Sequence, residues 1–139
     1  MSATVIPRPR VPAVVLQLVR FGLVGATNTA LTLAAYAVLA ALHTPVPVAG
    51  AVGWGVGAVN GFVLNRAWTF RCAARGAVPA ARYAAVALAG SGLNAALVGI
   101  AVGQQHLPHI AGELAVLPPV TLFTFVLCRV WVFRPAVPA

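Results

Sequence analysis

The side chains that could take part in chemistry are few. Glu113 is the only acidic residue among 139, and the nine basic residues are all arginine. The sequence therefore contains no carboxylate pair, no Ser-His-Asp set and no glycine-rich phosphate loop, which are common catalytic arrangements. We predict that the protein is not an enzyme.

A metal site is not expected either. His106 and His109 lie near Glu113 in the sequence, but no cysteine joins them and their spacing matches no strong zinc pattern. No pattern indicates a cofactor. An ionisable residue inside a membrane segment is a functional candidate, whereas one at the interface can simply be hydrated. The role of Glu113 stays open on this basis.

An arginine-aromatic motif occurs twice. Segment 60–71 reads Asn-Gly-Phe-Val-Leu-Asn-Arg-Ala-Trp-Thr-Phe-Arg, and its phenylalanine, arginine and tryptophan positions recur 63 residues later in segment 123–134. Each copy ends an apolar run with arginine and tryptophan. Both side chains favour the headgroup level of a bilayer, because each combines an apolar body with a group that needs water. The motif therefore predicts the end of a membrane helix in each half of the chain.

The composition supports a membrane protein. Hydrophobic residues make up 61% of the chain and charged residues only 7%, whereas a water-soluble domain has about a quarter charged residues. The net charge of +8 does not indicate a nucleic-acid partner, because the arginines punctuate apolar segments instead of forming a polar face. We predict an all-α integral membrane protein.

Four apolar segments are long enough to cross a bilayer. The expected transmembrane helices cover about 14–42, 48–68, 82–102 and 110–133. They form a membrane domain, 14–134, between an N-terminal tail, 1–13, and a C-terminal tail, 135–139. Each pair of helices starts with arginine followed by an aromatic residue and ends with the repeated motif, which predicts two helical hairpins in a parallel repeat.

The arginines also predict the orientation. With four spans, all of them fall on one side of the membrane, and the two loops of the other side contain none. By the positive-inside rule, both termini and the middle loop are cytoplasmic. The arginines in question are Arg8, Arg10, Arg20, Arg66, Arg71, Arg75, Arg82, Arg129 and Arg134.

With its repeated motif and four apolar segments, the chain resembles the GtrA-like family of small four-helix bacterial membrane proteins. The resemblance covers about Arg20 to Arg134. It implies a location in the bacterial cytoplasmic membrane, a role in cell-surface polysaccharide biosynthesis and a polyprenyl-phosphate-linked sugar as the partner. It rests on Arg20-Phe21, on Gly25 and Asn28, on the motif from Asn60 to Phe70 and on its echo from Phe125 to Phe133.

A phosphorylated lipid would find few polar groups in the membrane segments. The candidate substrate-binding residues are Asn28, Asn60, Asn65, Arg66 and Arg129. Arginine binds phosphate through two parallel hydrogen bonds, and counting from the arginines places Asn28 and Asn60 at similar depth. Two alternatives stay open. The asparagines can instead join helices through hydrogen bonds, and the arginines can instead anchor helix ends at the interface.

The two halves are expected to contribute unequally. Phe123 and Cys128 stand in the second half where Asn60 and Asn65 stand in the first. The second half therefore has fewer hydrogen-bonding groups beside its arginine, and we expect the first half to dominate the site.

Gly53, Gly57 and Gly61 follow one another at four-residue spacing in the second segment. Such a ridge allows another helix to approach closely. We expect it to serve helix packing, either within the chain or in a homodimer formed through this face.

Two functions follow from the resemblance. The first is translocation of a polyprenyl-phosphate-linked sugar across the cytoplasmic membrane. The second is a scaffold that holds or regulates a glycosyltransferase without transporting anything. A small multidrug-type transporter is a weak third alternative, because proton-coupled efflux needs a carboxylate deep in the first helix and positions 20–42 contain none.

Overall fold

The computed structural model describes residues 12–73, 76–104 and 108–133, and of His109 and Ile110 it describes the backbone alone. The predicted N-terminal tail up to residue 11 and the predicted C-terminal tail, 135–139, lie outside these ranges. Arg8, Arg10, Arg75, His106 and Arg134 lie outside the described residues.

The described residues form α-helices and no strand, as expected for an all-α membrane protein. The long helices are α1 (Ala13–Ala41), α2 (Val46–Leu64), α3 (Ala77–Gly103) and α4 (His109–Leu127). Two short π-helices extend them, η1 (Asn65–Thr69) after α2 and η2 (Cys128–Val132) after α4. All four long helices, counted with these extensions, are long and apolar enough to cross a membrane. The chain is a multi-pass membrane protein.

Proline and glycine set where the helices begin. Pro45 and Pro108 directly precede α2 and α4. α3 begins at Ala77, earlier than the boundary expected near 82, although Pro79 follows. A proline in the first turn is tolerated because the amide it lacks has no partner within the helix there. Gly76, which precedes α3, has a φ of 108°, a conformation that suits glycine.

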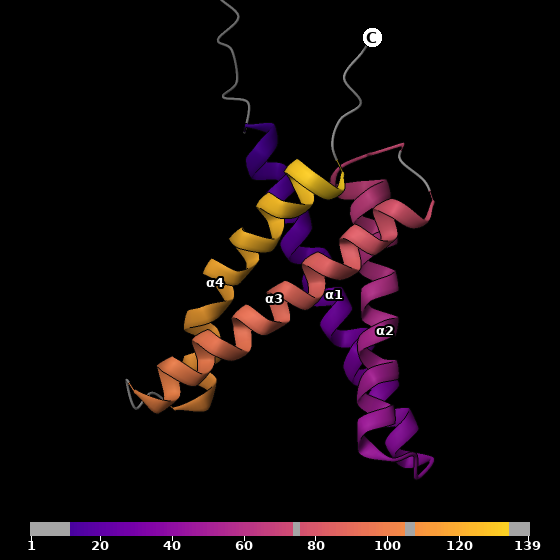
Figure 1. Ribbon diagram of the computed structural model, residues 1–139, viewed down its shortest axis with the longest axis vertical. Helices are drawn as coiled ribbons and strands as arrows, with labels where there is room; N and C mark the ends of the chain where they lie inside the picture. Colours follow the sequence, from indigo (N-terminus) through magenta and orange to yellow (C-terminus); the bar gives the residue numbers. More distant parts are fainter. Residues whose placement is uncertain (1–11, 74–75, 105–107, 134–139) are drawn as a thin grey trace, which may run out of the picture.

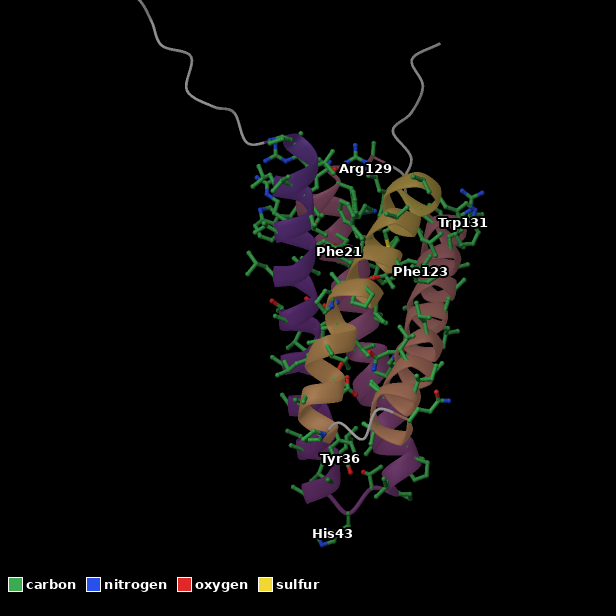
Figure 2. All side chains as sticks on the ribbon, turned by 90° about the vertical axis from the view of Figure 1, so that its left-hand side faces the viewer. Phe21, Tyr36, His43, Phe123, Arg129 and Trp131 are labelled. Carbon is green, nitrogen blue, oxygen red and sulfur yellow. The ribbon has the colours of Figure 1, made fainter. Side chains whose placement is uncertain are left out.

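The four helices form two hairpins in a parallel repeat. α1 pairs with α2, and α3 pairs with α4, and both hairpins start at the same end of the molecule (Figure 1). At that end the hairpins meet; toward the opposite end they diverge (Figure 1). Arg129 and Trp131 lie at the end where the hairpins meet, and His43 lies at the opposite end (Figure 2). We name these the arginine end and the far end.

The repeat extends to individual contacts. Arg20 donates a hydrogen bond of 3.3 Å to the backbone oxygen of Trp68, and its guanidinium lies 5.4 Å from the centre of that indole. In the second half, Arg82 makes the same two contacts with Trp131, at 3.4 and 5.7 Å. Each arginine at the start of a hairpin is thus fixed to the tryptophan at its end.

A cluster of aromatic rings joins the two hairpins near the arginine end. Neighbouring ring centres lie 5.1 to 6.1 Å apart, which is the spacing of favourable aromatic pairs. We refer to these rings as the aromatic cluster. They are Phe21, Phe62, Phe70, Tyr83, Phe125 and Phe133.

The glycine ridge of α2 is buried against α1 of the same chain. A Cβ atom on Gly53 would lie 2.8 Å from the backbone oxygen of Thr32. A Cβ on Gly57 would collide with the Thr32 hydroxyl, and one on Gly61 would collide with Asn28. The ridge therefore serves packing within the chain. Of the two roles expected for this face, the structure shows packing against α1, and homodimerisation stays a prediction.

Candidate functional site

Asn28 and Asn60 form a pair between α1 and α2. The side-chain amide of Asn60 donates a hydrogen bond of 2.7 Å to Oδ1 of Asn28, and both residues are half-buried. The predicted similarity in depth therefore brings the two side chains into contact. The pair connects the helices of the first hairpin beside the glycine ridge.

Asn65 points into the protein core and leaves only 2% of its surface exposed. Its Nδ2 donates to the Tyr83 hydroxyl at 3.3 Å, and its Oδ1 accepts a hydrogen bond of 2.9 Å from Thr69. The three side chains connect η1 of the first hairpin with α3 of the second. Sequence reasoning placed Asn65 beside a lipid headgroup, whereas the structure shows it joining the two hairpins.

The second half replaces this polar contact by an apolar one. Cys128 occupies the position equivalent to Asn65, and Phe21 the position equivalent to Tyr83. Both are buried in one hydrophobic cluster and line the same cavity. Because both partners change together, neither half contains an unsatisfied buried side chain among the described residues.

The two π-helices give the repeated motif its shape. The backbone amide of Phe70 donates to the oxygen of Asn65 at 2.8 Å, and that of Phe133 donates to the oxygen of Cys128 at the same distance. These bonds span five residues instead of the four of an α-helix. The wider turn occurs at the same position of each repeat, where it orients Arg66 and its equivalent.

Arg66 and Arg129 occupy equivalent positions in η1 and η2 and are both half-buried. The guanidinium of Arg66 lies 5.9 Å from the centre of the Phe62 ring. Arg129 donates a hydrogen bond to the side-chain oxygen of Gln17 on α1. The five predicted residues are thus distributed over separate contacts: the structure pairs Asn28 with Asn60, and the others contact residues outside the predicted set.

Between the hairpins, three cavities adjoin one another. Their volumes are about 400, 310 and 540 Å³, and Thr29 of α1 and Ala87 of α3 line all three. We call this space the central cleft. It extends from the aromatic cluster, two of whose members line the first cavity, toward the far end, where the hairpins diverge (Figure 1).

The first cavity is the apolar compartment of the cleft. It lies between α1, α3 and α4. On α1 it is lined by Gly22, Gly25 and Ala26, whose small size leaves room between the helices. Leu117 and Val120 of α4 form the opposite wall. Such a surface suits a hydrocarbon chain.

The third cavity is the polar compartment. Ser91 and Asn94 of α3 line it together with Glu113 and Thr124 of α4. Nδ2 of Asn94 donates a hydrogen bond of 3.3 Å to Oε2 of Glu113, whose side chain is exposed. The only acidic side chain of the sequence therefore faces the cleft. Sequence reasoning singled out Glu113 without a role and did not connect it with Asn94.

The cleft as a whole combines features that suit an amphiphilic molecule. An apolar compartment adjoins a compartment with an amide, a carboxylate and three hydroxyl groups. Both lie within the length of helices that can cross a membrane. Arginines occupy the end at which the cleft is closed.

The chain was also compared with known proteins. The family model described as the GtrA/DPMS transmembrane domain matches residues 20–133, which includes all four helices except the first turns of α1. No curated protein matches the chain.

Proposed function

Since this chain belongs to the GtrA/DPMS transmembrane-domain family, we propose that it translocates a polyprenyl-phosphate-linked sugar across the bacterial cytoplasmic membrane. Membership is consistent with a membrane protein that takes part in lipid-linked sugar processes. The observation that carries the proposal is the central cleft, in which an apolar and a polar compartment adjoin between two hairpins.

The two compartments match the two parts of such a lipid. A sugar cannot cross hydrocarbon unaided, because each polar group that loses its hydrogen bonds to water costs several kcal/mol. Hydroxyl, amide and carboxylate groups in the cleft, including those of Thr29, Ser91 and Asn94, can replace water along the path. The isoprenoid chain needs only an apolar surface, and Gly22 and Gly25 leave room for it beside α1.

The aromatic cluster would act as the gate of the cleft. It closes the arginine end, while the hairpins diverge at the far end (Figure 1). The positive-inside rule places the arginine end in the cytoplasm, so this conformation faces outward. Because the hairpins are equivalent units joined mainly at one end, rocking one against the other would open the cytoplasmic side.

Arg66 and Arg129 are the proposed phosphate contacts at the cytoplasmic mouth. Arg129 already donates to Gln17, whereas the described side-chain contact of Arg66 is with a phenyl ring, which has no oxygen or nitrogen to accept a hydrogen bond. A bidentate guanidinium–phosphate contact is stronger than a neutral hydrogen bond. We therefore expect Arg66 to bind the phosphate more strongly.

Reconstitution of the purified protein in vesicles tests the proposal. A labelled polyprenyl-phosphate sugar is added to the outer leaflet, and its arrival in the inner leaflet is followed by protection from a membrane-impermeant oxidant. No glycosyltransferase is present. Translocation faster than in protein-free vesicles supports the proposal. A rate equal to that of protein-free vesicles would refute it and favour the scaffold alternative.

A further inference from the structure

Glu113 is placed where its charge affects the contents of the cleft. It is the only acidic residue of the chain, it lines the polar compartment and its side chain is exposed. The described arginines with side-chain contacts bind tryptophan, phenylalanine or glutamine toward the arginine end. Glu113 lies near the start of the membrane span Ala111–Val132, and an ionisable residue in such a span is a functional candidate.

The groups around Glu113 are those that bind sugar hydroxyls. A carboxylate accepts hydrogen bonds through two oxygens, and an asparagine amide both donates and accepts. Asn94 uses one donor on Glu113 at 3.3 Å, which leaves its second N–H and its oxygen available for a ligand. Ser91 and Thr124 line the same cavity, but their hydroxyls already donate to backbone oxygens of their own helices. They therefore offer oxygen acceptors.

The first hairpin has no comparable site. With offsets of 62 and 63 residues, the positions equivalent to Asn94 and Glu113 are Thr32 and Gly50. Thr32 is packed against the glycine ridge, where even a Cβ on Gly53 would lie 2.8 Å from its backbone oxygen. A hydrogen-bonded carboxylate and amide therefore line the cleft in the second hairpin alone. The first half is expected to dominate at the phosphate contacts, whereas this pair belongs to the second half.

We propose that the polar compartment binds the sugar of the lipid, and that Glu113 restricts it to neutral or amino sugars by repelling anionic ones. The inference rests on the proposed function, because it concerns the headgroup of the translocated lipid. A sugar carboxylate beside Glu113 brings two like charges together and is repelled, whereas an ammonium group there is attracted. Neutral sugars bind through hydrogen bonds alone.

Binding of three matched lipids tests the inference. Short-chain polyprenyl phosphates carrying glucose, glucosamine or glucuronic acid are titrated against the protein in nanodiscs of zwitterionic phospholipid. The glucuronic acid lipid is expected to bind at least about tenfold more weakly than the glucose lipid, which corresponds to about 1.4 kcal/mol. Glu113→Gln, which keeps the size of the side chain, is expected to reduce this difference to less than about threefold and to weaken glucosamine binding.

Two controls separate charge from hydrogen bonding. Asn94→Ala removes the neutral partner and is expected to weaken all three sugar lipids while preserving their order. Polyprenyl phosphate without a sugar is expected to bind the wild type and the Glu113→Gln variant equally. Equal binding of all three sugar lipids by a wild type that translocates them would overturn the inference and leave the proposed function intact. If none of the three sugar lipids binds, both the inference and the proposed function are overturned.

Discussion

The replacement of Gly53 by alanine tests the packing of the first hairpin. An alanine Cβ at this position would lie 2.8 Å from the backbone oxygen of Thr32 and 3.5 Å from the backbone nitrogen of Tyr36. Backbone atoms cannot rotate away, so α1 and α2 must move apart at this position. Overpacking of this kind costs about 1–3 kcal/mol.

Gly55→Ala provides the matched control. Gly55 lies two residues further along the same helix, and a Cβ there meets nothing within 4 Å. Both substitutions gain the same helix propensity, up to about 1 kcal/mol, so this gain cancels in the comparison. Gly53→Ala is therefore expected to have a free energy of unfolding about 1–3 kcal/mol lower than that of Gly55→Ala.

The assay is reversible unfolding in mixed micelles with increasing dodecyl sulfate, followed by circular dichroism. Both variants are measured at the same lipid-to-detergent ratio, because detergent composition alters stability. Equal unfolding free energies for the two variants would contradict the close approach of α1 and α2 at Gly53.

Three further predictions concern the core, the orientation and the phosphate contacts. Tyr83→Phe removes the hydroxyl that accepts from the buried amide of η1 and is expected to lower the free energy of unfolding by about 1–3 kcal/mol; an unchanged value would contradict the contact. In a cysteine-free background, an impermeant thiol reagent added outside intact cells is expected to label Gln104→Cys and not Gly76→Cys, and the opposite pattern would refute the orientation. Arg66→Gln is expected to weaken lipid binding about tenfold or more, and Arg129→Gln less, since a hydrogen bond to a charged group contributes about 1.5–3 kcal/mol; equal losses would reject the asymmetry.

The fold could be predicted from the sequence because its signals are periodic or repeated. Apolar runs of sufficient length define membrane helices, and the recurrence of the motif at 60–71 in segment 123–134 defines two equivalent hairpins. The contact between Asn28 and Asn60 also follows from counting residues along each helix. Each of these arguments uses positions within one helix or one hairpin.

The features that could not be predicted depend on contacts between segments. The π-helical turn that begins at Asn65 differs from an α-helix only in the spacing of its backbone hydrogen bonds, and we found no sequence pattern that indicates it. This turn nevertheless directs the Asn65 side chain to Tyr83 of the other hairpin. The pairing of Asn94 with Glu113 requires the relative shift of α3 and α4, which apolar runs do not define. The polar compartment was therefore absent from the site predicted from the sequence, whose residues stay a prediction.

Translocation by two variants of α3, each with one alanine replaced by phenylalanine, tests the central role of the cleft most directly. Ala87 lines all three cavities, whereas Ala85 is exposed on the same helix and lines none of them. Ala87→Phe fills the cleft with a ring, and Ala85→Phe adds the same ring to the outside. Both are reconstituted with the labelled polyprenyl-phosphate sugar after folding has been verified by circular dichroism. We predict that Ala85→Phe translocates at the wild-type rate and that Ala87→Phe does not translocate; wild-type rates for both would contradict a path through the cleft.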